Sequence, residues 1–152
     1  MNINQNKIIQ VETTEGLQEV ILPVEDFGID PTDIDAVLCK MGKLLLYYGE
    51  VEAALKMEVE RKEADLEKLE ADFDSHVRWE AKTKSEKITE KQVETKVTVN
   101  PQRLQLIENL HRSRKNYNLA RWAMKALDAK KDCLLAIAYR DKEMMRVDRY
   151  NR

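Results

Sequence analysis

In two long stretches of this chain, mostly apolar residues recur at alternating intervals of four and three positions. This spacing constrains the fold most strongly. It places the repeated side chains on one face of a helix, as in coiled coils. We therefore expect two long amphipathic helices. The first series is Ile34, Leu38, Met41, Leu45, Tyr48, Glu52, Leu55, Val59, Lys62, Leu66, Leu69 and Phe73. The second series is Leu106, Leu110, Ser113, Tyr117, Ala120, Met124, Leu127, Lys131, Leu134 and Ala138.

Each series follows the same helix start signal, in which a capping residue precedes a proline. Asp30-Pro31 precedes the first series and Asn100-Pro101 precedes the second. Asp and Asn are favoured N-caps, and proline is favoured at the first helical position. The sequence thus predicts a helix over 31–79, a basic connector over 80–100 and a helix over 101–146. Helices of similar length with a connector of about 20 residues fold back as an antiparallel hairpin.

The segment before the first helix predicts a small β-hairpin. Short runs of alternating apolar and polar residues, 8–12 and 17–22, flank a turn at 14–16 that contains glycine. A hairpin this small must pack on something or pair across subunits, because an isolated one is marginally stable in water. A disordered N-terminal arm is the alternative. We expect residues 1–30 to form this arm or hairpin and residues 31–152 to form the helical hairpin domain.

Apolar residues also lie outside the two repeated series, and the fold-back brings them to the same end of the helical hairpin. Two helices cannot cover all of them, and an apolar patch of this size is seldom left exposed. We therefore expect an oligomer, mainly α and coiled-coil-like. The residues concerned are Leu44, Leu46, Tyr47, Leu119, Trp122, Ala123, Leu135, Ile137 and Tyr139.

Charge is unevenly distributed along the chain. Residues 1–35 hold one basic and eight acidic residues, net −7, whereas residues 100–152 hold thirteen basic and six acidic residues, net +7. Such asymmetry indicates contact with nucleic acid or head-to-tail pairing of subunits. An acidic helix lying on a basic helix of the same chain explains it equally well.

The sequence contains no pattern typical of an active site or a cofactor site. It lacks a glycine-rich phosphate loop, an H-E-x-x-H pair and a C-x-x-C pair. We expect His76 and His111 to be surface or interface residues, because a metal site needs converging ligands. We expect Cys39 and Cys133 to be buried and inert, and a hairpin centre near residue 90 would separate them too far for a disulfide. We predict neither catalysis nor a bound metal or cofactor.

Two groups of cations are candidates for contact with an anionic polymer. In the first, Trp79 lies beside the basic residues of the connector, where lysines neutralise phosphates and an indole can stack on an unpaired base. A solvated lysine-rich loop with a packed tryptophan is the alternative. The cations of this group are Arg78, Lys82, Lys84, Lys87, Lys91 and Lys96.

The second group is a stripe on the second helix, formed by Arg114, Asn118, Arg121 and Lys125 beside Tyr117 and Trp122. Its spacing of three and four residues puts these side chains on one helix face. The stripe could follow a phosphate backbone. It could equally pair with the acidic part of the first helix, over residues 50–70.

The connector carries a short motif that indicates a family. Residues 88–97 read ITEKQVETKV and precede Asn100-Pro101. This segment resembles the T-E-x-x-V-E-x-x-V motif of phage recombination mediator proteins of the UvsY type. The order of elements over about residues 34–145 is also similar, with an aromatic residue, Trp122, in the second long helix.

The resemblance implies a protein without enzymatic activity that binds single-stranded DNA and forms a ring-like homo-oligomer. Such mediators load a RecA-like recombinase onto DNA coated by single-strand binding protein. The family's DNA-contacting segment corresponds here to Arg78, Lys82, Lys84 and Lys87, and more weakly to Arg61 and Lys62.

Two further expectations complete the interpretation of the sequence. No segment approaches the roughly 20 apolar residues of a membrane span, and the start lacks the apolar core of a signal peptide. We therefore expect a cytoplasmic protein, in a bacterial host if the resemblance holds. The alternative function is a structural coiled-coil adaptor or virion assembly protein that does not bind DNA.

Overall fold

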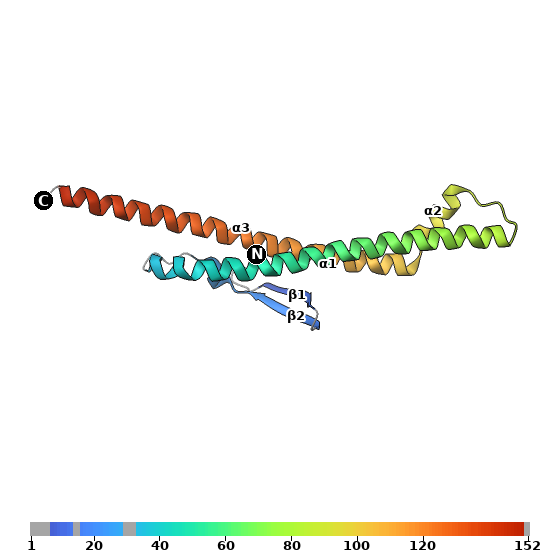
Figure 1. Ribbon diagram of the computed structural model, residues 1–152, viewed down its shortest axis with the longest axis horizontal. Helices are drawn as coiled ribbons and strands as arrows, with labels where there is room; N and C mark the ends of the chain where they lie inside the picture. Colours follow the sequence, from blue (N-terminus) through green and yellow to red (C-terminus); the bar gives the residue numbers. More distant parts are fainter. Residues whose placement is uncertain (1–6, 14–15, 29–32, 151–152) are drawn as a thin grey trace. The chain divides into compact units, whose positions relative to one another are not determined.

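The computed structural model describes residues 7–13, 16–28 and 33–150. Its elements follow in the order β1 (Lys7–Thr13), β2 (Gly16–Leu22), the 3-10 helix η1 (Val24–Phe27), α1 (Ile34–Thr83), α2 (Glu90–Thr98) and α3 (Pro101–Tyr150), as Figure 1 shows. The fold class predicted from the sequence is confirmed, because long helices dominate and a small antiparallel β-hairpin precedes them. Oligomerisation stays a prediction.

The chain packs as two compact units, and α1 and α3 contribute to both. The terminal unit comprises the described residues of Met1–Ala54 and Asn118–Arg152, and the middle unit is Leu55–Tyr117. The division predicted at residue 30 stays a prediction.

In the terminal unit, the described apolar side chains of the β-hairpin divide between a buried face and an exposed face. Ile9 pairs with Val20 across the two strands, and both side chains are buried together with Leu22. Ile8 pairs with Ile21, and both are exposed. This follows from the alternation of side chains along a strand. The hairpin that the sequence predicted is confirmed, although residues 14 and 15 of its turn lie outside the described residues.

The polar contacts of Asp26 with Tyr48 and Lys130, which we call the latch, hold η1 against both long helices in the terminal unit. The Tyr48 hydroxyl of α1 donates to Asp26 Oδ2 at 2.9 Å, and Lys130 Nζ of α3 donates to the Asp26 carbonyl at 2.8 Å. Tyr48 is 1% exposed, and its ring lies 6.0 Å from that of Phe27. Burial, and then the hydrogen bond to Asp26, raise the pKa of the Tyr48 hydroxyl. Asp26 thus connects three elements that are far apart in sequence.

In the middle unit, three polar side chains meet where the repeated series of the two helices is interrupted. Lys62 Nζ donates to Glu58 Oε1 at 2.6 Å and to Ser113 Oγ at 2.7 Å, and Ser113 Oγ donates to Glu58 Oε1 at 2.6 Å. Glu58 and Ser113 are buried. A buried carboxylate requires such partners, because losing water without replacement costs several kcal/mol. This polar cluster therefore fixes the alignment of α1 with α3 in the middle unit.

The observed alignment corrects the hairpin centre predicted near residue 90. That centre would pair residue 62 with 118 and residue 70 with 110. Instead Lys62 contacts Ser113, and Arg103 Nε donates to Glu70 Oε1 at 2.6 Å. The prediction was wrong because α1 continues past the level at which α3 begins, and α2 packs beside this extension (Figure 1).

The helix ends differ from the prediction in two places. α1 extends to Thr83 rather than to 79, and α3 extends to Tyr150 rather than to 146. The predicted cap at Asp30-Pro31 lies outside the described residues, and Asp33 Oδ1 accepts the Ala36 N–H at 3.1 Å. The start at Asn100-Pro101 is confirmed, since Asn100 Oδ1 accepts the N–H of Gln102 at 2.8 Å.

The prediction that both cysteines are buried was wrong. Cys39 and Cys133 are exposed, with free thiols. Both lie outside the positions at which their helices bury side chains, such as Met41 in α1 and Leu134 in α3. A helix in a narrow bundle buries one stripe only, and cysteines outside that stripe face solvent.

The polar cluster leads to a prediction about stability. We expect Lys62→Met to lower the free energy of unfolding by about 2 to 3 kcal/mol, because it removes an ammonium group that donates to the buried Glu58 carboxylate. Lys56→Met is the matched control, since Lys56 pairs with Glu60 over the same spacing but both side chains are more than 60% exposed. We expect this control to change stability by less than about 0.5 kcal/mol in urea titrations. Equal losses in the two variants would contradict the assigned role.

The latch leads to a prediction about alkaline pH. The pKa of Tyr48 is raised above its ordinary value of 10.0, so its stabilising contribution is complete below pH 10 and is lost as pH rises through the raised pKa. Urea titrations of the wild type and Tyr48→Phe should therefore converge as pH rises above 10. A stability difference that stays constant through this range would contradict the latch.

Candidate nucleic-acid interface

The end of α1, the following turn and α2 form the part of the middle unit that holds the predicted connector. α2 begins with a capping box: Thr89 Oγ1 accepts the Gln92 N–H, and Gln92 Oε1 accepts the Thr89 N–H at 2.9 Å. Val93 of α2 is buried, as are Val77 and Ala81 of α1. The sequence predicted a connector here, and the helix α2 is a difference from that prediction. Thr89 and Gln92 at capping-box spacing are the signal that could have revealed it.

The turn after α1 is built without glycine. Ser85 has a φ of 55°, in the left-handed region, while its N–H bonds the Lys82 carbonyl and the Glu86 N–H bonds the Ala81 carbonyl. These two bonds form a Schellman motif, which commonly ends a helix and commonly contains glycine at this position. The turn therefore ends α1 abruptly and starts the return path that carries Lys87.

Arg78 clamps α2 to α1. Its guanidinium donates to Asp74 Oδ1 at 2.6 Å and to both carboxylate oxygens of Glu90, at 2.8 and 2.6 Å. The hydrogen bonds to Glu90 and then Asp74 raise the pKa of Arg78, and those same bonds lower the pKa of Glu90 and of Asp74. Arg78 was predicted to contact DNA. This contact stays a prediction, and the guanidinium has a structural role between the two helices.

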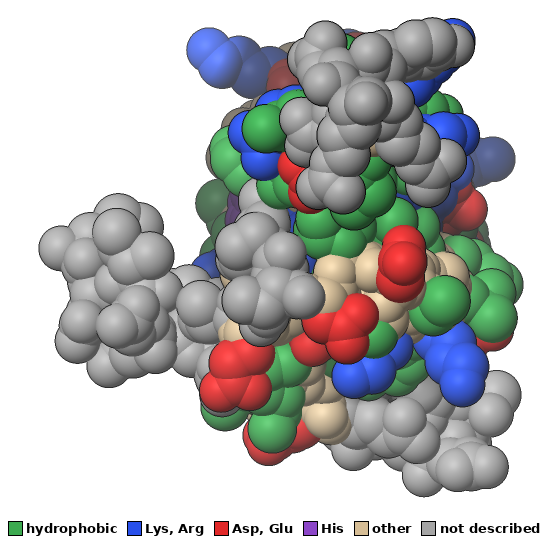
Figure 2. Space-filling model, turned by 90° about the vertical axis from the view of Figure 1, so that its left-hand side faces the viewer, with side chains coloured by type: hydrophobic (Ala, Val, Ile, Leu, Met, Phe, Trp, Pro, Cys, Tyr) green, Lys and Arg blue, Asp and Glu red, His purple; other side chains and the backbone are tan. Residues whose placement is uncertain are grey.

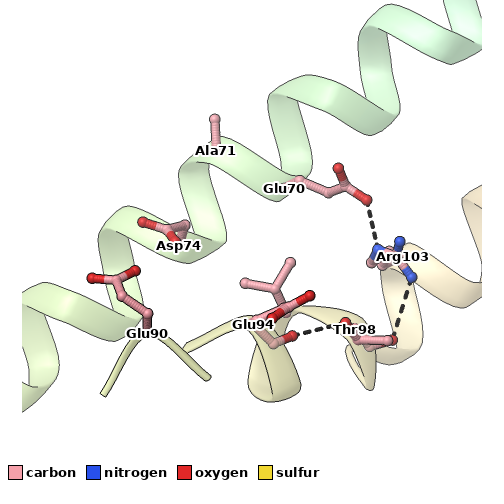
Figure 3. A pocket seen from close by; sticks show the side chains of 8 residues that line it. Glu70, Ala71, Asp74, Glu90, Glu94, Thr98 and Arg103 are labelled. Carbon is pink, nitrogen blue, oxygen red and sulfur yellow. Dashed lines mark hydrogen bonds and ion pairs between the residues drawn. The ribbon is translucent and has the colours of Figure 1, made fainter. Parts of the chain in front are cut away.

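An acidic groove lies on the Arg78 side of the two helices (Figure 3). It has a volume of about 470 Å³, and the ion pair between Glu70 and Arg103 lies in its wall. Carboxylates predominate among its charged groups, so this side repels a phosphate backbone. The lining residues are Glu70, Ala71, Asp74, Glu90, Glu94, Val97, Thr98 and Arg103.

The other side of α1 carries aromatic and basic side chains. At 3.6 residues per turn, His76, Trp79 and Glu80 lie away from Asp74 and Arg78. The rings of His76 and Trp79 stack with centroids 6.1 Å apart and planes inclined by 24°, and Trp79 is 63% exposed. We call His76 and Trp79 the aromatic platform. It offers a flat, solvent-accessible surface of the kind on which an unpaired base stacks.

Cations of two elements surround Glu80 on this side. Lys84 donates a hydrogen bond to Glu80, and this bond raises the pKa of Lys84. The same bond is the largest cause of a lowered pKa of Glu80, to which Lys96 of α2 and His76 also contribute. Lys84 therefore lies at this carboxylate, and Lys96 and His76 add to the positive field that acts on it.

The remaining predicted cations of the connector are exposed. Lys82 is in the last turn of α1, Lys87 follows Ser85, and Lys91 is in the first turn of α2. An exposed lysine can reach a phosphate without giving up a structural contact. The solvated-loop alternative named a packed tryptophan, whereas Trp79 is exposed.

The predicted stripe on α3 divides between the two compact units. In the middle unit, Arg114 donates to Glu63 of α1 at 2.7 Å, so Arg114 pairs with the acidic helix as one of the two alternatives proposed. In the terminal unit, Arg121, Lys125 and Trp122 are exposed. Contact of these residues with DNA stays a prediction.

Comparisons with known proteins do not name a family. No family model, curated protein or solved structure matches the chain. Over residues 7–13, 16–28 and 33–150, no three His, Cys, Asp or Glu side chains are grouped so that they could hold a metal ion. Within the same residues, none of the helices has an apolar stretch long enough to cross a membrane. Both histidines are exposed, as the sequence predicted.

The clamp leads to a prediction about α2. We expect Arg78→Ala to accelerate amide hydrogen exchange across α2 severalfold, because it removes the ion pairs between α2 and α1. Arg112→Ala is the matched control, since Arg112 is an exposed arginine that pairs with Glu108 within α3.

At acid pH, the amide exchange rates of α2 in the wild type should approach those of Arg78→Ala measured at the same pH. The pKa of Glu90 and of Asp74 is lowered from 4.5 and 3.8, so the contribution of the clamp is complete above these values. It is lost as pH falls through the lowered values. Unchanged exchange in Arg78→Ala, relative to Arg112→Ala, would contradict the clamp.

Proposed function

We propose that this protein binds single-stranded DNA at the α1–α2 end of the middle unit and acts as a recombination mediator. The observation that carries the proposal is the exposed aromatic platform, which Lys84 follows at the end of α1 and which faces away from the acidic groove. Lysines attract the phosphates, and the indole stacks on a base. The acidic groove restricts the strand to the other side of the two helices.

The chemistry favours a single strand over a duplex. The face of Trp79 can stack only on a base that is not already stacked within a double helix. Lysines contact phosphates without reading the sequence, so binding should be tolerant of sequence and sensitive to salt. A mediator needs both properties, because it acts on whichever DNA is unpaired.

The motif that resembles that of the mediator family builds α2 in this chain. Thr89 caps the helix, Glu90 binds the Arg78 clamp, and Val93 is buried. The motif therefore has a structural task here, which is to hold α2, the helix that carries Lys96, against α1. By the same resemblance, the proposed partners of this protein are a RecA-like recombinase and single-strand binding protein. The resemblance also implies a homo-oligomeric assembly.

Fluorescence anisotropy with a labelled oligo-dT strand tests the DNA site. We expect Trp79→Ala to weaken binding by roughly 5- to 100-fold, the range for loss of one base–aromatic stack. Lys96→Glu should weaken binding and reduce its salt dependence. Met57→Ala is the control, because Met57 is 71% exposed in the same unit but lies far from Trp79 along α1, and this variant should bind like the wild type. Trp122→Ala tests the alternative stripe on α3.

Three outcomes would overturn the proposed site or function. Absence of binding at low salt, or binding indifferent to salt, would favour the structural coiled-coil adaptor. A loss in Trp122→Ala with none in Trp79→Ala would move the site to Arg121 and Lys125. If Trp79→Ala binds DNA weakly, this variant should also shorten the time of recombinase assembly on coated DNA by less than the wild type does. Equal effects of the two proteins on assembly would separate DNA binding from mediator activity.

A further inference from the structure

α3 carries a second series of residues at intervals of three and four, and most of it faces solvent. It begins at the half-buried Leu119 and continues through exposed residues, in an outward seam distinct from the buried positions Ala120, Leu127 and Leu134. The seam residues are Leu119, Trp122, Ala126, Ala129, Cys133 and Ala136. All of them lie in the terminal unit, over about 27 Å of helix at 1.5 Å per residue.

The size of the seam side chains indicates what can cover it. Ala126, Ala129, Cys133 and Ala136 are small, so another helix can approach them closely. Figure 2 shows one face of the molecule on which hydrophobic side chains reach the surface beside charges of both signs. Alternation of three and four is the spacing that pairs two helices in a coiled coil.

The seam is complementary to itself when two copies run antiparallel. Centring a two-fold axis between Ala126 and Ala129 places Ala126 against the partner's Ala129, and Trp122 against the partner's Cys133. The same register places Leu119 against the partner's Ala136. The small residues meet at the centre, and the indole of each copy covers a smaller side chain of the other.

The flanking charges agree with the same register. Lys125 and Asp132 are exposed beside the seam, at equivalent positions of successive heptads. In the antiparallel register Lys125 faces the partner's Asp132, and the two-fold axis makes this pair twice. A parallel register would not bring Lys125 and the partner's Asp132 together, because the same flanking position of two parallel helices lies on opposite sides of the seam.

We propose that a second copy of this chain docks antiparallel on the outward seam of α3, with Lys125 against the partner's Asp132. The interface is isologous, so it produces a dimer or an assembly built from dimers. The inference is independent of the proposed DNA site, which lies in the middle unit. It goes beyond the predicted oligomer by specifying the surface, the orientation and the register.

Sedimentation velocity and light scattering on the full chain test whether the seam associates. We expect the wild type to have the mass of a dimer or an even multiple. Ala126→Glu should weaken association by at least about 100-fold, because it would bury an unpaired charge in the interface. Ala64→Glu is the matched control, an exposed alanine of α1 in the middle unit, and it should associate like the wild type. Circular dichroism verifies that both variants fold.

A charge exchange tests the register. We expect Lys125→Glu to raise the dissociation constant by about tenfold, because two attractive pairs become repulsive. The double variant Lys125→Glu/Asp132→Lys should restore the wild-type constant, since it inverts both pairs. Failure of the double variant to recover affinity would overturn the register.

Cross-linking tests the orientation. In a background with Cys39→Ser and Cys133→Ser, mixing Ala126→Cys with Ala129→Cys should give an oxidised dimer that contains one copy of each. Ala126→Cys cross-linked efficiently to itself would indicate a parallel pair and overturn the proposal. A monomeric wild type would also overturn the proposal. The same holds if Ala53→Glu on α1 abolishes association while Ala126→Glu leaves it unchanged.

Discussion

The buried contact among Glu58, Lys62 and Ser113 is the constraint on which the middle unit depends. Apolar seams of two long helices can tolerate a shift by one heptad, because one apolar side chain can take the place of another of similar volume. A polar cluster does not tolerate it. A shift by seven residues would place Glu58 opposite Leu106 or Ala120, with no hydrogen-bond donor at either position. The cluster thereby converts a general tendency to pair into one alignment.

This alignment also determines which charges become available for binding. Once Ser113 faces Lys62, Arg103 reaches Glu70 and Arg114 reaches Glu63. Two cations of the basic C-terminal part of the chain are then paired with carboxylates of α1. Part of the charge asymmetry is therefore balanced within one molecule. The cations beside the aromatic platform stay accessible because they lie past the start of α3.

Helix periodicity predicted much of the fold and little of the site. The repeats, the Asn100-Pro101 start and the N-terminal hairpin are local patterns, so a sequence reveals them. The extra length of α1 was invisible because Ser85, not glycine, takes the left-handed conformation that ends it. The division of the connector into an acidic groove and a basic aromatic side arises from tertiary contacts. Arg78 and Lys96 are both cations of this segment, but Arg78 clamps α2 to α1 and Lys96 adds to the positive field at Glu80.

The contacts that hold the two units together internally differ widely in the length of chain that each one closes. Arg78 and Glu90 are 12 residues apart, Glu70 and Arg103 are 33 apart, and Lys62 and Ser113 are 51 apart. Lys130 and Asp26 are 104 residues apart. Closing a longer loop costs more chain entropy, so within the middle unit this cost rises from the Arg78–Glu90 contact to the Lys62–Ser113 contact. Within the terminal unit, the contact between Asp26 and Lys130 closes a longer loop than any of these and depends most on the packing around it.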